Sequence, residues 1–142
     1  MAAEGGVRTF DLSVVTPDGA AFEGEAEMVI VPGAAGEIGV LARHAPLVAM
    51  LKAGEIRVKA GNEWQSFAAG PGYFKVQQDR AIALVDDAVP AKEIDPERAQ
   101  RQLDEARAEL ERVEADDSDA DRWQLEQRVR HAENQLGVIG RA

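Results

Sequence analysis

The sequence predicts an all-β sandwich of about nine or ten strands, followed by an antiparallel hairpin of two α-helices. Two observations carry this prediction. Up to about residue 90, hydrophobic and polar residues alternate with a period of two, which is typical of half-buried strands. From Glu93 the hydrophobic period lengthens to three and four residues, which is typical of amphipathic helices. We therefore expect a β domain over residues 1–90 and a helical domain over residues 91–142.

Composition narrows the class of protein. The net charge of −10 disfavours unspecific binding to nucleic acid or to anionic lipid. No hydrophobic run approaches the ~18 residues that span a bilayer, so we expect no direct insertion into a membrane. The start, MAAEGGVRTF, lacks a secretory signal pattern, which predicts that the chain stays in the compartment where it is made. The absence of cysteine excludes disulfides and thiolate nucleophiles, and two distant histidines make no metal site.

The strands are expected where large apolar residues recur at every second position. Their predicted inward residues include Phe10, Leu12 and Val14, then Ile56 and Val58, then Phe74 and Val76, then Ile82 and Leu84. Turn sequences separate these runs: TPDG at 16–19, Gly61–Asn62, GPG at 70–72 and QQD at 77–79. Short strands with this spacing predict an antiparallel sandwich or barrel.

The first helix has a clear predicted start. Asp95 precedes Pro96, and proline favours the first helical position, so Asp95 fits the N-cap and its carboxylate would accept backbone N–H groups. The two helical seams are Ala99, Leu103, Ala106, Leu110 and Val113, and then Leu125, Val129, Ala132 and Leu136. Between the seams, residues 115–121 are too polar to be buried and predict a loop.

The hairpin is expected to be only marginally stable by itself. Burying the large aliphatic side chains of its seams would contribute about 10 kcal/mol. Ordering about 45 backbone residues costs ~1 kcal/mol or more each, which hydrogen bonds offset only in part. The hairpin must therefore be stabilised by packing against the sandwich, against another protein, or against each in turn.

Two stretches carry a resemblance to a known family. They are GAAGEIGVLARHAPLVAMLKAGEIRV at 33–58 and IDPERA at 94–99, supported by FDLSVVTPDG at 10–19 and GYFKV at 72–76. Together they resemble the epsilon subunit of the F-type proton-translocating ATP synthase, over nearly the whole chain.

The resemblance implies a non-catalytic subunit of the rotating central stalk, at the cytoplasmic face of a bacterial-type cell membrane. In that family the sandwich binds the gamma subunit and the membrane c-ring, and so couples proton flow to ATP synthesis. The helical hairpin either folds down on the sandwich or extends beside gamma toward the alpha and beta subunits, where it blocks ATP hydrolysis.

The resemblance also implies contact residues. Glu37 and His44 match the family's c-ring contact loop. Where the family usually has a proline or glycine pair just before the histidine, this chain has Ala42 and Arg43, and Arg43 adds a cation that could meet polar or acidic groups of the ring.

A nucleotide site is the second implied feature. Ile94, Asp95, Arg98 and Ala99 match the motif at which some family members bind ATP. The surroundings are poorer in cations than such a site requires. His131 and Gln135 stand where arginines are expected, Glu105 stands where a basic residue is expected, and Val89 stands where an acidic one would help. Arg101, Arg107, Arg128 and Arg130 could substitute from shifted positions. Any ATP binding is thus expected to be weak, and the alternative is a plain helix cap.

Arg122, Arg128 and Arg130 concentrate positive charge in the second helix. They could contact an acidic surface of a neighbouring subunit, or form a solvated face with Glu126 and Glu133 as partners within the helix. The alternative function for the whole chain is a free small-ligand-binding sandwich with a permanently packed helical tail.

Overall fold

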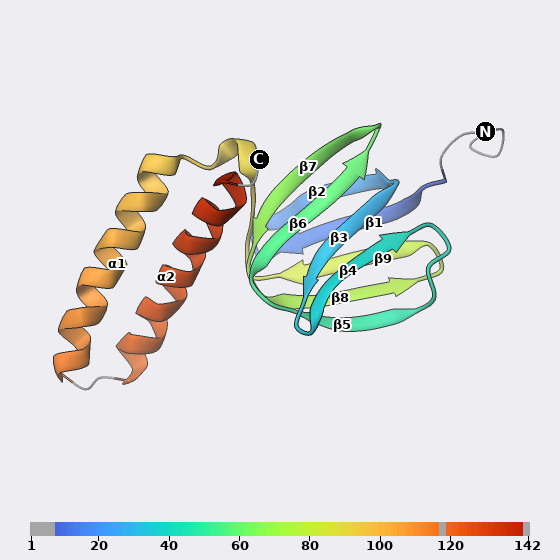
Figure 1. The fold of residues 1–142 in the computed structure, drawn as a ribbon. Helices are drawn as coiled ribbons and strands as arrows, with labels where there is room; N and C mark the ends of the chain where they lie inside the picture. The colour runs from blue at the N-terminus through green and yellow to red at the C-terminus, as the bar shows by residue number, and fades with distance from the viewer. Residues whose placement is uncertain (1–7, 117–118, 141–142) are drawn as a thin grey trace. The chain divides into compact units, whose positions relative to one another are not determined.

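The computed structural model describes residues 8–116 and 119–140. The chain divides into two compact units, Met1–Pro90 and Ala91–Ala142. Among the described residues, the first unit holds ten β-strands, and the second holds a short 3₁₀ helix and two α-helices (Figure 1). The predicted fold class is confirmed, because both the strand period and the helical period appear as the expected elements.

The β unit is one strongly bent sheet. Its strands are β1 (Phe10–Thr16), β2 (Gly19–Ala26), β3 (Met28–Gly33), β4 (Gly36–Leu41), β5 (Leu47–Leu51), β6 (Gly54–Ala60), β7 (Glu63–Ala69), β8 (Gly72–Gln77), β9 (Arg80–Val85) and β10 (Ala88–Pro90). They follow the order β10-β7-β6-β3-β5-β8-β9-β1-β2, with β4 added beside β3. All neighbours are antiparallel except β1 and β9. Strands β3 and β5 share a register only at Gly33 and Leu51, which divides the sheet into two layers.

The core lies between these layers. Phe67 and Phe74 are the largest fully buried side chains, and Leu12, Ile56 and Val58 pack in the same cluster. These residues occupy alternate positions of their strands, as the two-residue period predicts.

Strand β9 faces the opposite way from the prediction. Ala81, Ala83 and Val85 point into the core, whereas Leu84 is exposed and Ile82 is half-buried. The reason is the register: Ala81 and Ala83 lie level with the buried Leu12 and Val14 of the parallel strand β1. The prediction assigned the larger residues to the core, but small residues fill this position.

Two tight turns fix strand pairs. Gly61 and Asn62 both have positive φ, 61° and 68°, and Gln78 and Asp79 have φ of 52° and 56°. Two consecutive residues with positive φ form the type I′ turn, whose twist matches that of a β-hairpin. Both turns lie where the sequence predicted them.

The second unit contains η1 (Ala91–Glu93), α1 (Pro96–Asp116) and α2 (Asp119–Gly140), and the two long helices contact each other along their length. Leu103 and Ala106 of α1 and Leu125 and Ala132 of α2 are buried. The other predicted seam residues, Leu110, Val113, Val129 and Leu136, are half-buried.

The connection between the helices is shorter than predicted. Helix α1 continues to Asp116 and α2 begins at Asp119, so both helices extend into the predicted loop 115–121. Residues 117–118 lie outside the described part of the chain. Neither described helix is long and apolar enough to cross a membrane.

Candidate docking surfaces and hairpin site

The loop between β4 and β5 carries Arg43 and His44. Arg43 has a φ of 65°, which is the left-handed conformation. Its backbone N–H donates a hydrogen bond to Oδ1 of Asp79 in the β8–β9 turn. His44 Nδ1 lies 2.7 Å from the carbonyl oxygen of Ala45. The loop is thus tied to the neighbouring turn through its backbone, and the Arg43 side chain is not needed for that contact.

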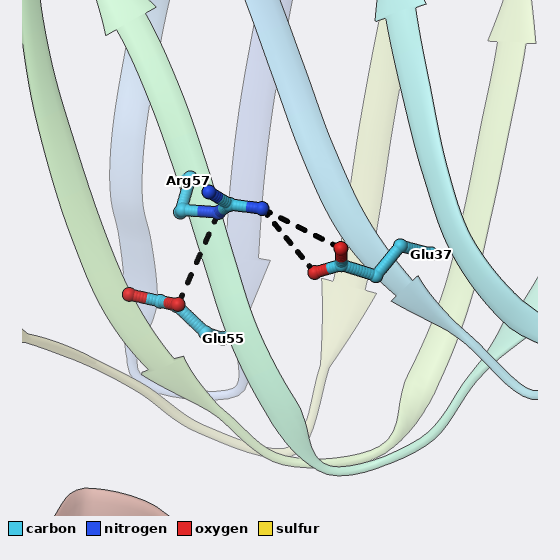
Figure 2. A network of polar contacts seen from close by, with 3 residues as sticks. All are labelled: Glu37, Glu55 and Arg57. Atoms are coloured by element: carbon cyan, nitrogen blue, oxygen red, sulfur yellow. Dashed lines mark hydrogen bonds and ion pairs between the residues drawn. The ribbon is translucent and has the colours of Figure 1, made fainter. Parts of the chain in front are cut away.

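Glu37 of β4 belongs to a charged cluster with Glu55 and Arg57 of β6, shown in Figure 2. Arg57 Nη2 lies 3.4 Å and 3.5 Å from the two carboxylate oxygens of Glu37. Arg57 Nε lies 3.9 Å from Oε1 of Glu55, which is only 8% exposed. One guanidinium therefore lies between a nearly buried carboxylate and an exposed one, and its positive charge lowers the cost of burying Glu55.

The three predicted c-ring residues lie at the two ends of β4. Glu37 lies at the start of β4, whereas Arg43 and His44 follow its end. Six residues of extended strand span roughly 20 Å. The three residues lie within eight positions of the sequence, but the extended strand separates Glu37 from Arg43 and His44.

An exposed apolar face was missed in the sequence. Val48 is 71% exposed, Met50 61%, Tyr73 57% and Leu84 48%. Met50 pairs with Tyr73, and Tyr73 with Leu84, so these side chains form one row across β5, β8 and β9. Val48 lies on the same face of β5, two positions from Met50 and just beyond the Arg43–His44 loop. The prediction reversed the phase of β9 and so placed Leu84 in the core. In the structure the larger residues of β9 point away from the core.

The predicted nucleotide motif forms the start of the hairpin. Asp95 Oδ1 accepts hydrogen bonds from the backbone N–H groups of Glu97 at 3.0 Å and Arg98 at 3.3 Å. Ile94 and Ala99 are buried, and Arg98 is exposed. The predicted N-cap is confirmed, and the carboxylate occupies the donors that a phosphate group would use at a helix N-terminus.

Two arginines of the hairpin, Arg107 and Arg128, form ion pairs between the helices. Arg107 Nη2 lies 3.2 Å from Oε2 of Glu133, and Arg128 Nη1 lies 3.9 Å from Oε2 of Glu109. The predicted pairing of Glu133 with arginines of its own helix is therefore wrong, because the antiparallel seam brings α1 residues closer. His131 Nε2 lies 2.8 Å from Gln135 Nε2, so these two side chains contact each other where the nucleotide motif would need cations.

The remaining predicted contact residues differ in exposure. Arg130 is exposed. Arg122 is half-buried, and its Nε is buried without a hydrogen-bond partner among the residues that the structure describes. Within residues 8–116 and 119–140, Arg128 alone of the three forms an ion pair. Its partner, Glu109, lies on α1.

Comparison with known proteins identifies the family. A family model described as ATP synthase, Delta/Epsilon chain, beta-sandwich domain matches residues 9–91. The ATP synthase epsilon chain of Halalkalibacterium halodurans is 38% identical over 133 residues, which cover 94% of this chain and 98% of that one. The chain belongs to the ATP synthase epsilon family. The resemblance predicted from the sequence is thus confirmed.

Other epsilon-family members agree. The ATP synthase epsilon chain of Rubrobacter xylanophilus is 35% identical and the alignment covers 99% of this chain and 97% of that one. The sodium ion specific ATP synthase epsilon chain of Propionigenium modestum is 38% identical over 76% of this chain and 79% of its own length. A chain of the Euglena gracilis mitochondrial ATP synthase structure has a TM-score of 0.75 at 24% identity, covering 96% of this chain and 86% of that one. That last likeness concerns the fold.

Proposed function

We propose that this epsilon-family chain is a non-catalytic subunit of the central stalk of an F-type ATP synthase. The observation that carries the proposal is the length of the match: relatives named ATP synthase epsilon chain align along both units, and one alignment covers 99% of the chain. The sandwich docks on the stalk, the hairpin regulates, and the subunit is peripheral at the cytoplasmic face of the membrane.

The gamma subunit docks on the exposed apolar face of β5, β8 and β9. A row of large apolar side chains on an otherwise acidic protein is the surface with most to gain from burial against another subunit. The Arg43–His44 loop leads directly into β5, so a subunit that covers Val48 and Met50 also reaches the loop.

The c-ring meets the Glu37 end of β4. Glu37 is exposed, and Arg57 of β6 holds its carboxylate in place from the other side of β3. Glu37 and the Arg43–His44 loop lie at the two ends of β4, and in this proposal they contact different partners. The resemblance implies c-ring contact for all three residues, and this proposal keeps it for Glu37.

The hairpin acts as a brake on ATP hydrolysis. Its buried seam relies partly on alanines, such as Ala99, Ala106 and Ala132, which bury little area. The two docked states of a weakly anchored hairpin differ in free energy by a few kcal/mol. A modest difference in binding free energy therefore shifts the hairpin from one state to the other. In the extended state Arg122, Arg128 and Arg130 contact acidic surface of the alpha and beta subunits.

ATP binding at the hairpin is weak in this proposal. Of the motif Ile94, Asp95, Arg98 and Ala99, only Arg98 offers a free cation, since Ile94 and Ala99 are buried and Asp95 caps the helix. A single guanidinium binds a triphosphate only weakly.

A pulldown with tagged full-length chain tests the docking proposal. We expect gamma and c subunits to be recovered with the wild-type chain. Met50→Asp with Tyr73→Asp should reduce recovery of the complex severely, because two charges would enter an apolar interface. Glu37→Lys should weaken the hold on the ring while gamma remains bound.

Trp64→Asp is the matched control. Trp64 is 50% exposed, like the residues of the proposed gamma face, but lies on β7 in the other layer. Its substitution should leave recovery of gamma unchanged. A wild-type chain that elutes as a monomer without gamma would contradict the proposal and favour the free ligand-binding sandwich.

A further inference from the structure

We propose that Asp79 is a positioning residue for docking, because it holds the Arg43–His44 loop in the conformation that meets the gamma subunit. The proposal rests on the proposed function of the chain. It concerns a contact within the β unit, between the β8–β9 turn and the β4–β5 loop, at one end of the sandwich (Figure 1).

The loop has an unfavourable backbone conformation at Arg43. With a φ of 65°, Arg43 occupies the left-handed region that glycine adopts freely and that other residues adopt at a cost. No glycine stands at this position or next to it. A contact from outside the loop therefore helps to keep the loop in this conformation.

Asp79 supplies that contact. Its carboxylate accepts the N–H of Arg43, and a carboxylate acceptor makes a stronger hydrogen bond than a neutral one. The carbonyl oxygen of Asp79 accepts the N–H of Asp11 at 3.0 Å, at the start of β1. The residue is itself fixed in the type I′ turn with Gln78. Asp79 thus connects three segments of the sandwich, and one of them is the docking loop.

Loss of the Asp79 contact would change the direction of the residues that follow Arg43. A single change of φ at Arg43 would turn the following residue, His44, and would redirect the entry into β5. Val48 and Met50, on the proposed gamma face, follow within a few residues. Loss of the Asp79 contact should therefore weaken docking without removing any side chain that touches gamma.

The test uses three full-length variants. Asp79→Gly removes the carboxylate and keeps the turn, because glycine suits positive φ. Asp79→Asn keeps an acceptor oxygen and a residue that tolerates this conformation. Gln78→Gly is the matched control, because it changes the neighbouring turn position, with a φ of 52°, and leaves the carboxylate in place.

The first measurement is amide hydrogen exchange at Arg43 in the isolated chain. We expect exchange to be about tenfold faster in Asp79→Gly, as befits the loss of one hydrogen bond, and close to wild type in Asp79→Asn and Gln78→Gly. Unchanged exchange in Asp79→Gly would overturn the proposal.

The second measurement is the affinity for an alpha–beta–gamma complex that lacks this subunit. We expect Asp79→Gly to bind several-fold more weakly, while Asp79→Asn and Gln78→Gly bind like wild type. Faster exchange with unaltered affinity would refute the positioning role. If the wild-type chain failed to bind, the proposed function itself would be wrong, and the exchange result would still show whether the contact exists.

Discussion

Asp95 shows how a motif residue can have a complete structural role. Its carboxylate accepts two N–H groups of the first turn of α1, directly before Pro96. That geometry is what the capping rule predicts from the Asp-Pro pair alone. Two groups then remain that could attract a nucleotide phosphate. One is the exposed Arg98, and the other is the positive end of the helix dipole, which the Asp95 carboxylate already neutralises in part.

Substituting Asp95 tests the cap. Asp95→Ala should destabilise the hairpin by about 1 kcal/mol, because two N–H groups lose their acceptor. Asp95→Asn keeps an acceptor oxygen and should cost clearly less. Urea unfolding followed by the circular dichroism of the helices measures both. Equal losses in the two variants would show that the carboxylate acts by charge and not as a cap.

Titration with ATP tests the nucleotide motif. We expect binding no tighter than the millimolar range, because the nearby Arg107 and Arg128 are paired with glutamates and His131 contacts Gln135. The weak signal should disappear in Arg98→Ala. Saturable binding at micromolar ATP in the wild-type chain would contradict this account.

At the scale of elements, sequence periodicity located the strands better than it oriented them. Phe10, Phe74 and Val76 point inward as predicted, because each is the bulky member of a clear alternation. Strand β9 alternates alanine with isoleucine and leucine, so either face looks apolar. Its neighbour β1 decides the phase, and a pairing across almost seventy residues cannot be derived from local pattern. The exposed face that includes Leu84 was missed for this reason.

The hairpin shows the same limit. Spacing within one helix suggested partners for the arginines of α2, but Arg128 reaches Glu109 and Glu133 reaches Arg107 across the seam. The pairing depends on how the two antiparallel helices are aligned, which neither helix determines alone. The helix start was predictable because it depends on adjacent residues.

Gly72 offers a prediction at this scale. A Cβ at Gly72 would overlap the carbonyl group of Leu84 in the neighbouring strand β9. Gly72→Ala should therefore destabilise the sandwich by about 3 kcal/mol, since backbone cannot move aside as a side chain can. Gly137→Ala is the control: its Cβ would meet nothing within 4 Å, and the helix should gain about 1 kcal/mol. Guanidinium unfolding compares the two, and a tolerated Gly72→Ala would contradict the close strand packing.

The two units should also differ in stability. The sandwich buries Phe67, Phe74, Leu12 and Ile56, whereas the hairpin seam is built partly from alanine. We expect amides of α1 and α2 in the isolated chain to exchange much faster than those around Phe74 in β8, because the hairpin opens without unfolding the sandwich. Equal protection throughout would mean that the hairpin is not weakly anchored.

At the scale of the whole molecule, the sequence change after residue 90 and the division between Pro90 and Ala91 describe a β platform followed by a separate helical unit. The family motifs made the overall resemblance predictable. The exposed row of Met50, Tyr73 and Leu84 was not, because its residues come from three strands that meet only in the folded sheet. Surfaces of this kind depend on strand direction and on pairing between distant segments.

The brake is the central claim, and truncation tests it most directly. ATP hydrolysis is measured on the ATP synthase assembled with the full-length chain and with a chain that ends at Lys92, with equal incorporation of both verified. We predict that the truncated chain assembles normally, since the sandwich forms its own core, and that hydrolysis rises. Normal assembly with unchanged hydrolysis would contradict the account.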